Sequence, residues 1–203
     1  MDLAKIQLSA KELELVQDAG ILLTKNTIIE KVYHLFGEMA GEVRTMIAGR
    51  PVGLPPEILT PSPKISKGEN YEGLPWVMLD YPRFFNKLDI FAIRGMFWWG
   101  HYFILTLHLK GKYLEQYAPV LEKNLAVLAA EDFHVSIGTD EWKHELSSDN
   151  YMALQQCDSL MQQGTKPGHD FCKLSAKISL QQWNQANRLL AGLYETILRA
   201  MEI

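Results

Sequence analysis

The chain has 203 residues, of which 47% are hydrophobic and 22% charged, proportions that are typical of a globular protein and exclude a disordered one. Its 20 basic and 24 acidic side chains are interspersed and leave a net charge of −4, so the sequence lacks the large basic surface that a nucleic-acid partner requires. The length fits a single domain over residues 1–203.

The cysteine content and the first residues indicate a cytoplasmic setting. Cys157 and Cys172 are too few for a disulfide scaffold and are not spaced like zinc ligands. The first 15 residues carry charge every few positions, so neither a secretory signal nor a lipidation motif is expected. The most apolar stretch, MFWWGHYFILTLHL at 96–109, has 14 residues, whereas a membrane span needs about 20. No membrane partner is expected.

The N-terminal region predicts two helices. Ser9 and Glu12 have the spacing of a capping box, with Leu8 as the hydrophobic staple, so a helix should begin near residue 10. A second helix should run from about 27 to 47, and Gly49 and Pro51 should end it. The stripe that predicts it recurs every three or four residues and consists of Ile28, Val32, Leu35, Met39, Val43 and Met46.

Residues 49–75 are rich in Pro and Gly and show no sustained period. They predict a long connection, which at this length is either functional or mobile. Residues 74–80 then predict a strand, and the Pro-containing segment 81–89 predicts a turn.

The aromatic centre of the chain predicts two strands, at 90–98 and 101–109, which meet near Gly100. Period-two alternation gives them one apolar face, formed by Phe91, Ile93, Phe97, Phe103, Leu105, Leu107 and Leu109. The opposite face is mixed and contains Ala92, Arg94, Met96, Trp98, Tyr102, Ile104, Thr106 and His108. Such a contrast is typical of an antiparallel sheet that helices cover on one side.

The second half of the chain predicts five further elements. A helix is expected at about 112–131, a hairpin at 134–146 around a Gly-Thr-Asp turn, and a shorter helix from Ser148 to Gly164. A strand should follow at 171–178, and Ser179 with Gln182 predicts a capping box for the last helix.

These elements together predict an α+β fold. Strands and helices do not alternate regularly, and no internal repeat is present. We expect a mostly antiparallel sheet of five or six strands, covered on one side by the N-terminal, middle and C-terminal helices.

The mixed face carries the first candidate site. A buried Arg94 must be paired, because an unpaired buried charge costs several kcal/mol, and Asp80 is its natural partner. In a binding pocket Arg94 would hold an anionic group and Asp80 would orient His108, with Trp98 and Tyr102 as walls. The alternative is an ion pair beside a turn, without a ligand.

The predicted hairpin carries the second candidate. With a three-residue loop at 138–140, His134 would lie opposite His144, close enough for both to bind a metal if Glu131 joined them. A four-residue loop would pair His134 with Glu145 instead. Two surface histidines without a metal are the alternative.

Tryptophans form the third candidate, an aromatic platform of Trp76, Trp98, Trp99 and Trp142. Most strand aromatics belong to the core, but adjacent Trp98 and Trp99 must point to opposite sides of a strand. One of them therefore lines either a pocket or an interface with a second subunit, so a homodimer stays open.

No phosphate-binding glycine loop, nucleophile elbow or H-E-x-x-H motif is present, and no cofactor is expected. The sequence therefore favours a protein that binds a small-molecule ligand or a protein partner through the mixed face of its sheet. The rival hypothesis is a hydrolase in which His108 or His101 is the general base, Asp80 orients it and Arg94 binds the anion, with His134 and His144 in a metal-dependent variant.

Overall fold

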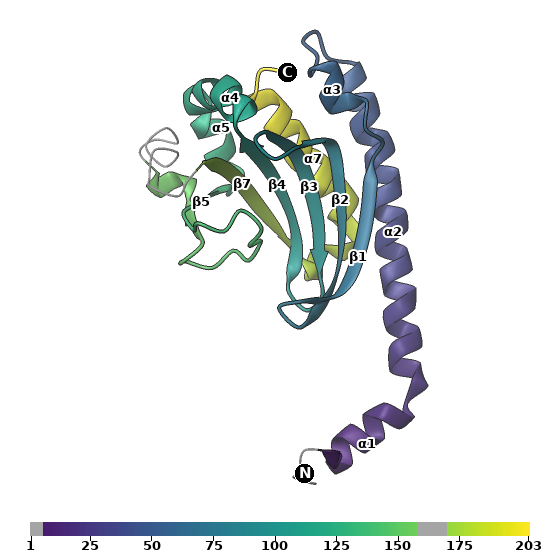
Figure 1. Ribbon diagram of the computed structural model, residues 1–203. Coiled ribbons are helices and arrows are strands. Elements are labelled where there is room, and N and C mark those ends of the chain that lie inside the picture. Colours follow the sequence, from purple (N-terminus) through teal and green to yellow (C-terminus); the bar gives the residue numbers. More distant parts are fainter. Residues whose placement is uncertain (1–5, 158–169) are drawn as a thin grey trace.

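The computed structural model describes residues 6–157 and 170–203 and confirms the predicted α+β class (Figure 1). The strands of these residues form one antiparallel sheet in the order β1-β2-β3-β4-β7-β5-β6. Its seven strands slightly exceed the predicted five or six.

Five long strands and two short ones make up the sheet. The long ones are β1 (Lys64–Tyr71), β2 (Leu74–Phe85), β3 (Ile90–Trp98), β4 (Tyr102–Lys110) and β7 (Phe171–Ser179), and the short ones are β5 (His134–Ser136) and β6 (Tyr151–Ala153). The predicted strands at 90–98, 101–109 and 171–178 are thereby confirmed to within a residue at each end.

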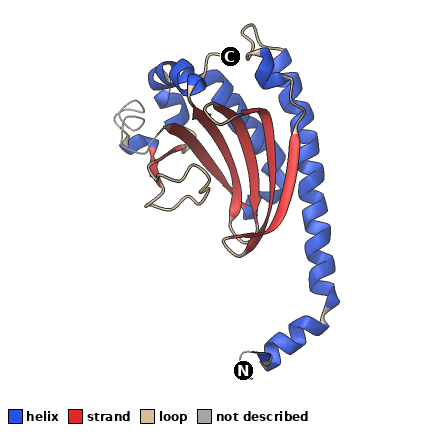
Figure 2. Cartoon of the chain, viewed as in Figure 1, coloured by secondary structure: helices blue, strands red, loops and turns tan. Residues whose placement is uncertain are grey.

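The helices flank this sheet (Figure 2). They are α1 (Ala10–Gln17), α2 (Ala19–Ala48), α3 (Pro56–Leu59), α4 (Lys112–Lys123), α5 (Leu125–Ala129) and α7 (Ala186–Ala200), with 3-10 helices η2 (Leu154–Gln156) and η3 (Leu180–Gln185). Helices α2 and α7 are the long ones and lie along the sheet, whereas α1 projects beyond it.

Side-chain caps explain the N-terminal helices. Both hydrogen bonds of the capping box are present, from Glu12 N to Ser9 Oγ and from Ser9 N to Glu12 Oε2. Asp18 accepts a hydrogen bond from Gly20 N and caps α2, so that α2 begins at Ala19 and not near residue 27 as predicted.

Four predicted segments need correction. The connection 49–75 contains α3 and the edge strand β1, and residues 81–85 continue β2 past a cis Tyr81–Pro82 bond and a bulge instead of turning. The hairpin 134–146 is absent, because β5 pairs with β6 and β7. Residues 151–153 form strand β6, not the start of a helix. The remainder of that predicted helix, 158–164, lies outside the described residues.

The predicted division of the sheet faces is confirmed. The apolar face of β3 and β4 packs in the main core with the stripe of α2 and with Leu190, Tyr194 and Ile197 of α7. Tyr194 also donates a hydrogen bond from its hydroxyl to the Tyr81 carbonyl, 3.1 Å away, which ties α7 to β2. Met78, Met96, Trp98 and Ile104 form a separate cluster on the mixed face.

Phe36 connects α2 to the centre of the sheet. Its side chain is buried, its ring centroid lies 6.4 Å from that of Phe103, and its ring packs over Gly95 of β3. We expect Phe36→Ala to lower the free energy of unfolding by about 3–5 kcal/mol, through lost burial and a residual cavity. Urea denaturation measures the change, with exposed His34→Ala on the same helix as the control. Equal effects of the two variants would contradict this packing.

Candidate functional site

The mixed face of the sheet buries a cluster of polar side chains. Strands β2, β3, β4 and β7 contribute Asp80, Arg94, Thr106, His108, Lys173 and Ser175, and all six are buried. Residues 137–150, here called the covering loop, pack on this face: His144 contacts Arg94, and the Lys143 carbonyl accepts a hydrogen bond from Lys173 Nζ. The mixed face is therefore largely closed by this loop.

Asp80 and Arg94 form the centre of the cluster. They lie opposite each other on β2 and β3. Arg94 Nε is 2.6 Å from Asp80 Oδ1 and Nη2 is 3.2 Å from Oδ2, so the ion pair is bidentate. The side chains are only 8% and 7% exposed, which makes each charge dependent on the other.

His144 extends the ion pair into the covering loop. Its Nε2 lies 3.3 Å from Arg94 Nη1, and its backbone N donates a 2.6 Å hydrogen bond to the Tyr71 hydroxyl. Burial, and then the positive charge of Arg94, hold the pKa of His144 well below its usual value. The neutral ring can accept a hydrogen bond from the guanidinium.

Lys173 is fully buried beside this pair. Its Nζ donates to the Lys143 carbonyl and lies 5.3 Å from the centre of the Tyr151 ring. Burial, and then the nearby positive charge of Arg94, lower the pKa of Lys173 to about 7. The amine is therefore close to half neutral at pH 7, which reduces the cost of burying it.

His108 lies between two aromatic rings on the same face. Its ring centroid is 5.7 Å from that of Trp142 and 5.9 Å from that of Phe171. The buried Nε2 lies 3.5 Å from Glu141 Oε2, and no described residue forms a hydrogen bond with it. Burial, helped by Lys173 and Arg94, lowers the pKa of His108 to about 3, so the ring is neutral.

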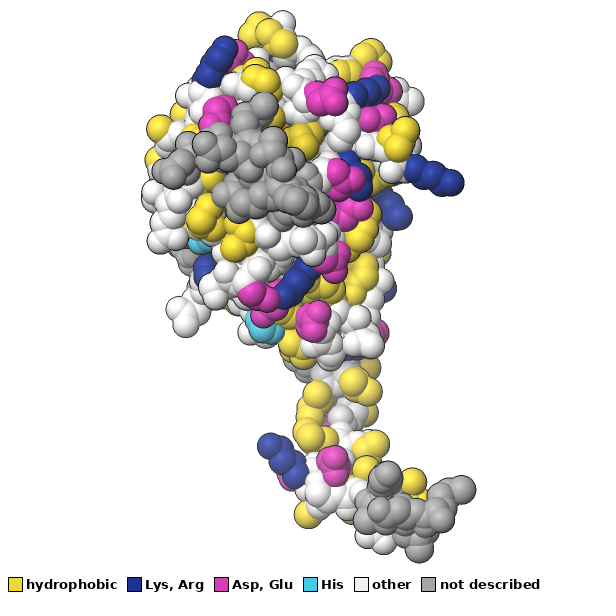
Figure 3. Space-filling view, turned by 60° about the vertical axis from the view of Figure 1, so that its left-hand side comes forward, with side chains coloured by type: hydrophobic (Ala, Val, Ile, Leu, Met, Phe, Trp, Pro, Cys, Tyr) yellow, Lys and Arg dark blue, Asp and Glu magenta, His cyan; other side chains and the backbone are white. Residues whose placement is uncertain are grey.

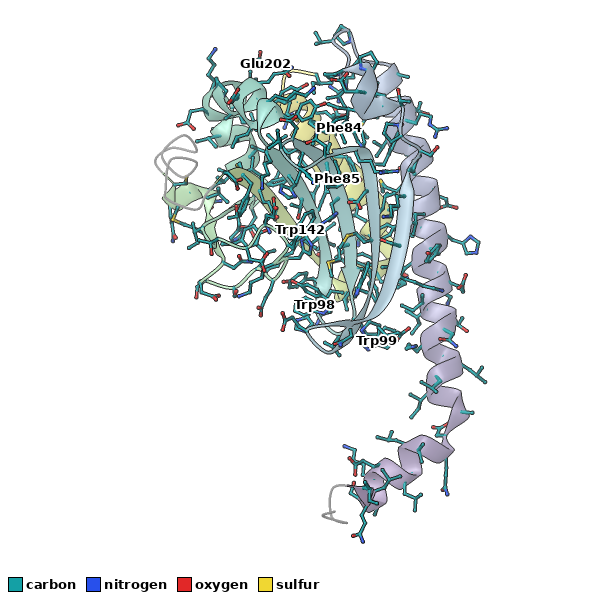
Figure 4. All side chains as sticks on the ribbon, viewed as in Figure 1. Phe84, Phe85, Trp98, Trp99, Trp142 and Glu202 are labelled. Carbon is teal, nitrogen blue, oxygen red and sulfur yellow. The ribbon has the colours of Figure 1, made fainter. Side chains whose placement is uncertain are left out.

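A pocket of about 360 Å³ opens next to the ion pair and is lined by Lys64, Asp80, Arg83, Phe85, Arg94 and Trp142. The centres of the Phe85 and Trp142 rings lie 6.4 Å apart, and Arg94 Cζ lies 5.7 Å from the first and 5.6 Å from the second. Figure 4 labels Phe85 and Trp142. Two aromatic rings and three cations therefore surround one cavity.

The structure brings together some of the predicted site residues and separates others. Asp80 and Arg94 pair as expected, but both Asp80 oxygens are engaged by Arg94, while His108 is near Glu141 instead. Trp98, His101 and Tyr102 lie at the β3–β4 turn, the end of these strands away from the pocket (Figure 4). There His101 stacks on Trp98 with ring centroids 3.5 Å apart.

The predicted metal ligands are not cross-strand neighbours, because the hairpin that would have paired them is absent. His134 lies opposite Ala153 and Ser175, and its Nδ1 is 2.9 Å from the Asp132 carbonyl, whereas His144 contacts Arg94. Within residues 6–157 and 170–203, no group of three or more His, Cys, Asp or Glu side chains is arranged to hold a metal ion.

The sequence patterns gave no role in a site to Lys64, Arg83, Phe85 or Lys173. Lys173 had a usable signal, because alternation in FCKLSAKIS places it on the same face as Ser175. Lys64 sat in the assumed connection, and Arg83 and Phe85 sat in the assumed turn. Their place beside Arg94 depends on strand pairing that those assumptions removed.

Comparisons with known proteins add no functional information: no family model, curated protein or solved structure matches this chain. No helix of the described residues has both the length and the apolar composition of a membrane span.

The buried ion pair predicts the effect of removing one charge. Asp80→Asn keeps the side-chain size but leaves Arg94 uncompensated, and we expect the free energy of unfolding to fall by about 3–5 kcal/mol. Glu30→Gln removes an exposed partner of Lys67, 3.7 Å away, and should cost no more than about 1 kcal/mol. Urea denaturation compares the two variants, and similar losses would contradict the assigned role of Asp80.

The buried histidine predicts an acid-sensitive stability. His108 titrates near 6.5 when unfolded but at about 3 when folded, so between these values the unfolded chain binds the extra proton. Its contribution is therefore complete above pH 6.5 and falls as the pH drops, by up to about 1.4 kcal/mol per pH unit.

We expect His108→Leu to show a shallower loss of stability between pH 6 and pH 4 than the wild-type chain, and exposed His34→Gln to behave as wild type. Urea denaturation across this range measures the slopes. An unchanged slope in His108→Leu would show that other groups set the acid sensitivity.

Proposed function

We propose that this chain binds a small organic carboxylate in the pocket beside Arg94. The observation that carries the proposal is a guanidinium held in place by Asp80, close to two aromatic rings, at the wall of a cavity of about 360 Å³. That volume lies within the range of small-molecule sites, about 300–1,000 Å³.

The charges of the lining favour an anion. Lys64, Arg83 and Arg94 are opposed by one acid, Asp80, whose two oxygens already accept hydrogen bonds from Arg94. Among the described residues, the hydrogen bonds of Arg94 use three of its five N–H groups. The remaining donors, with the two neighbouring cations, are suited to a carboxylate.

The aromatic rings favour a ligand with an apolar body. Trp142 is 48% exposed, an unusual amount for so large an apolar side chain, and its ring is tilted by 33° from that of Phe85. A flat or aliphatic group against these rings would remove apolar surface from water, while its carboxylate reaches the cations. A lining of aromatic rings and cations thus supports the proposal that the protein binds small molecules.

The alternative is a hydrolase in which His108 is the general base. Its buried Nε2, without a hydrogen bond from the described residues, is the feature that favours catalysis. A pKa of about 3 and a 1% exposed ring weigh against it, because a general base works best with a pKa near the working pH and within reach of its substrate. Binding without catalysis is therefore the better supported proposal.

Benzoate is a suitable probe, because it combines a carboxylate with an aromatic ring. We expect its addition to shift the indole N–H signal of Trp142 in the NMR spectrum, and neutral benzamide to have little effect. Lys64→Met and Arg83→Met should each weaken benzoate binding by up to about tenfold, measured by titration calorimetry.

Lys67→Met is the matched control, because Lys67 is on the same strand but its Nζ lies 5.2 Å from the Tyr33 ring of α2, on the opposite face. Benzoate affinities that are equal in the Lys64, Arg83 and Lys67 variants would overturn the proposal. Equal binding of benzamide would overturn the assignment of a carboxylate.

A further inference from the structure

The N-terminal arm, defined here as residues 6–28, carries most of the exposed large hydrophobic side chains of the described residues. Eight of the eleven large hydrophobic side chains that are exposed in the described residues belong to it: Ile6, Leu8, Leu13, Leu15, Val16, Ile21, Leu22 and Leu23. The arm extends away from the sheet, and apolar side chains are visible along it (Figures 1 and 3). A concentration of this kind marks an interaction surface.

The apolar stripe of α2 does not stop where the sheet ends. Ile29, Val32 and Phe36 are buried against the body of the protein. On the same side of the helix, Leu22 lies seven residues before Ile29 and Ile21 eleven before Val32; they are 60% and 46% exposed, and Lys25 stands between them and the buried part of the stripe. The same side of the helix is therefore apolar beyond the sheet as well, where this chain supplies no described partner for it.

Helix α1 also lacks a partner within the described chain. It has eight residues and none of them is buried. Isolated helices shorter than about 12–15 residues are marginal in water, and one capping box contributes little against that cost. Contact with a second surface would stabilise both α1 and the exposed part of α2.

The charges of the arm are separated along its length. The outer part carries Glu12, Glu14 and Asp18 against one lysine, Lys11. The part next to the body carries Lys25, whose Nζ is 2.7 Å from Glu69 Oε2 of β1. Beyond the arm α2 carries Glu30 and Lys31, and Lys67 Nζ of β1 lies 3.7 Å from Glu30. Three lysines are opposed by two glutamates there, so this end keeps a net positive charge, and Lys31 takes part in neither of these two ion pairs. Two arms side by side in opposite directions would place the acidic end of each against the basic end of the other.

We propose that two copies of this chain associate through their N-terminal arms, which pack antiparallel about a two-fold axis. Each arm offers eight exposed large hydrophobic side chains, and packing them against a second copy would remove their apolar surface from water. A two-fold pair is self-complementary, so a single surface serves both partners. A membrane surface is less well matched, because interfacial helices carry a Lys- and Arg-rich polar face whereas the outer arm is acidic.

Sedimentation velocity of the full chain tests the proposal. We expect a concentration-dependent dimer, and we expect the double variant Val16→Glu/Leu22→Glu to be monomeric with an unchanged near-ultraviolet circular dichroism spectrum, which reports on the body because the arm has no aromatic residue. Leu88→Glu is the matched control, because Leu88 is 76% exposed but lies outside the arm, and it should dimerise as wild type.

Charge reversal tests the antiparallel arrangement. Glu14→Lys and Lys31→Glu should each raise the dimer dissociation constant several-fold, and the double variant should restore it; Lys25 is left unchanged because it pairs with Glu69 of its own chain. In a parallel pair like ends would already face each other, so failure of the double variant to restore association would overturn the arrangement.

A chain that stays monomeric at high micromolar concentration would overturn the proposal as a whole. Co-sedimentation of such a monomer with phosphatidylcholine–phosphatidylserine vesicles, lost in Val16→Glu/Leu22→Glu, would assign the arm to a membrane instead.

Discussion

The ion pair between Asp80 and Arg94 determines how the second face of the sheet is built. Two charges that are 7% and 8% exposed must satisfy each other, and their remaining polar atoms need partners as well. His144 supplies one such partner from the covering loop, and the low pKa of its ring keeps it neutral beside the guanidinium. The same positive charge helps to lower the pKa of Lys173 to about 7 and that of His108 to about 3. Burial is the main cause of these low pKa values, and the charge of Arg94 adds to it in all three side chains.

The covering loop has the local chemistry that this role requires. Asn150 donates to the carbonyl of Glu145, 2.7 Å away, and its own carbonyl accepts a hydrogen bond from Ile137 N at 2.8 Å, so the loop is closed on itself. Gly138 lies so close to Asn150 that a Cβ would be 2.5 Å from Oδ1. The Tyr71 and Tyr102 hydroxyls accept hydrogen bonds from His144 N and Leu146 N, which connects the loop to the sheet. A loop held at both its ends and its middle can position Trp142 at the rim of the pocket.

How much the sequence could predict depended on the range of the interactions involved. The capping box at Ser9, the stripe of α2 and the alternation of β3 and β4 are local patterns, and they correctly predicted the start of α1, the part of α2 that covers the sheet, the central strands and the faces of Arg94 and His108. Strand β1 was not predicted, because the Pro and Gly residues around it indicated a loop. Strand β2 continues past Pro82 through a bulge, which no short sequence pattern predicts. The partners of β5 are set by pairing with β7, about 40 residues away, so the proximity of His134 and His144 could not be judged from their spacing. The burial of Lys173 could not be predicted either, because the covering loop that packs on it is distant in sequence.

The two proposed surfaces belong to opposite sides of the fold. The arm continues α2, which packs with the main core on the apolar face of the sheet, whereas Asp80 and Arg94 open onto the other face. Association through the arms would therefore bury the extension of the helical layer and leave the pocket accessible in each copy. Because α2 is continuous from Ala19 to Ala48, the arm and the helix that covers the sheet are one element. Association that stabilises the arm would therefore also stabilise the part of α2 whose Ile29 and Val32 pack in the core. The pocket lies on the other face of the sheet, and no residue of this helix lines it. Stability and ligand binding can thus respond independently to association.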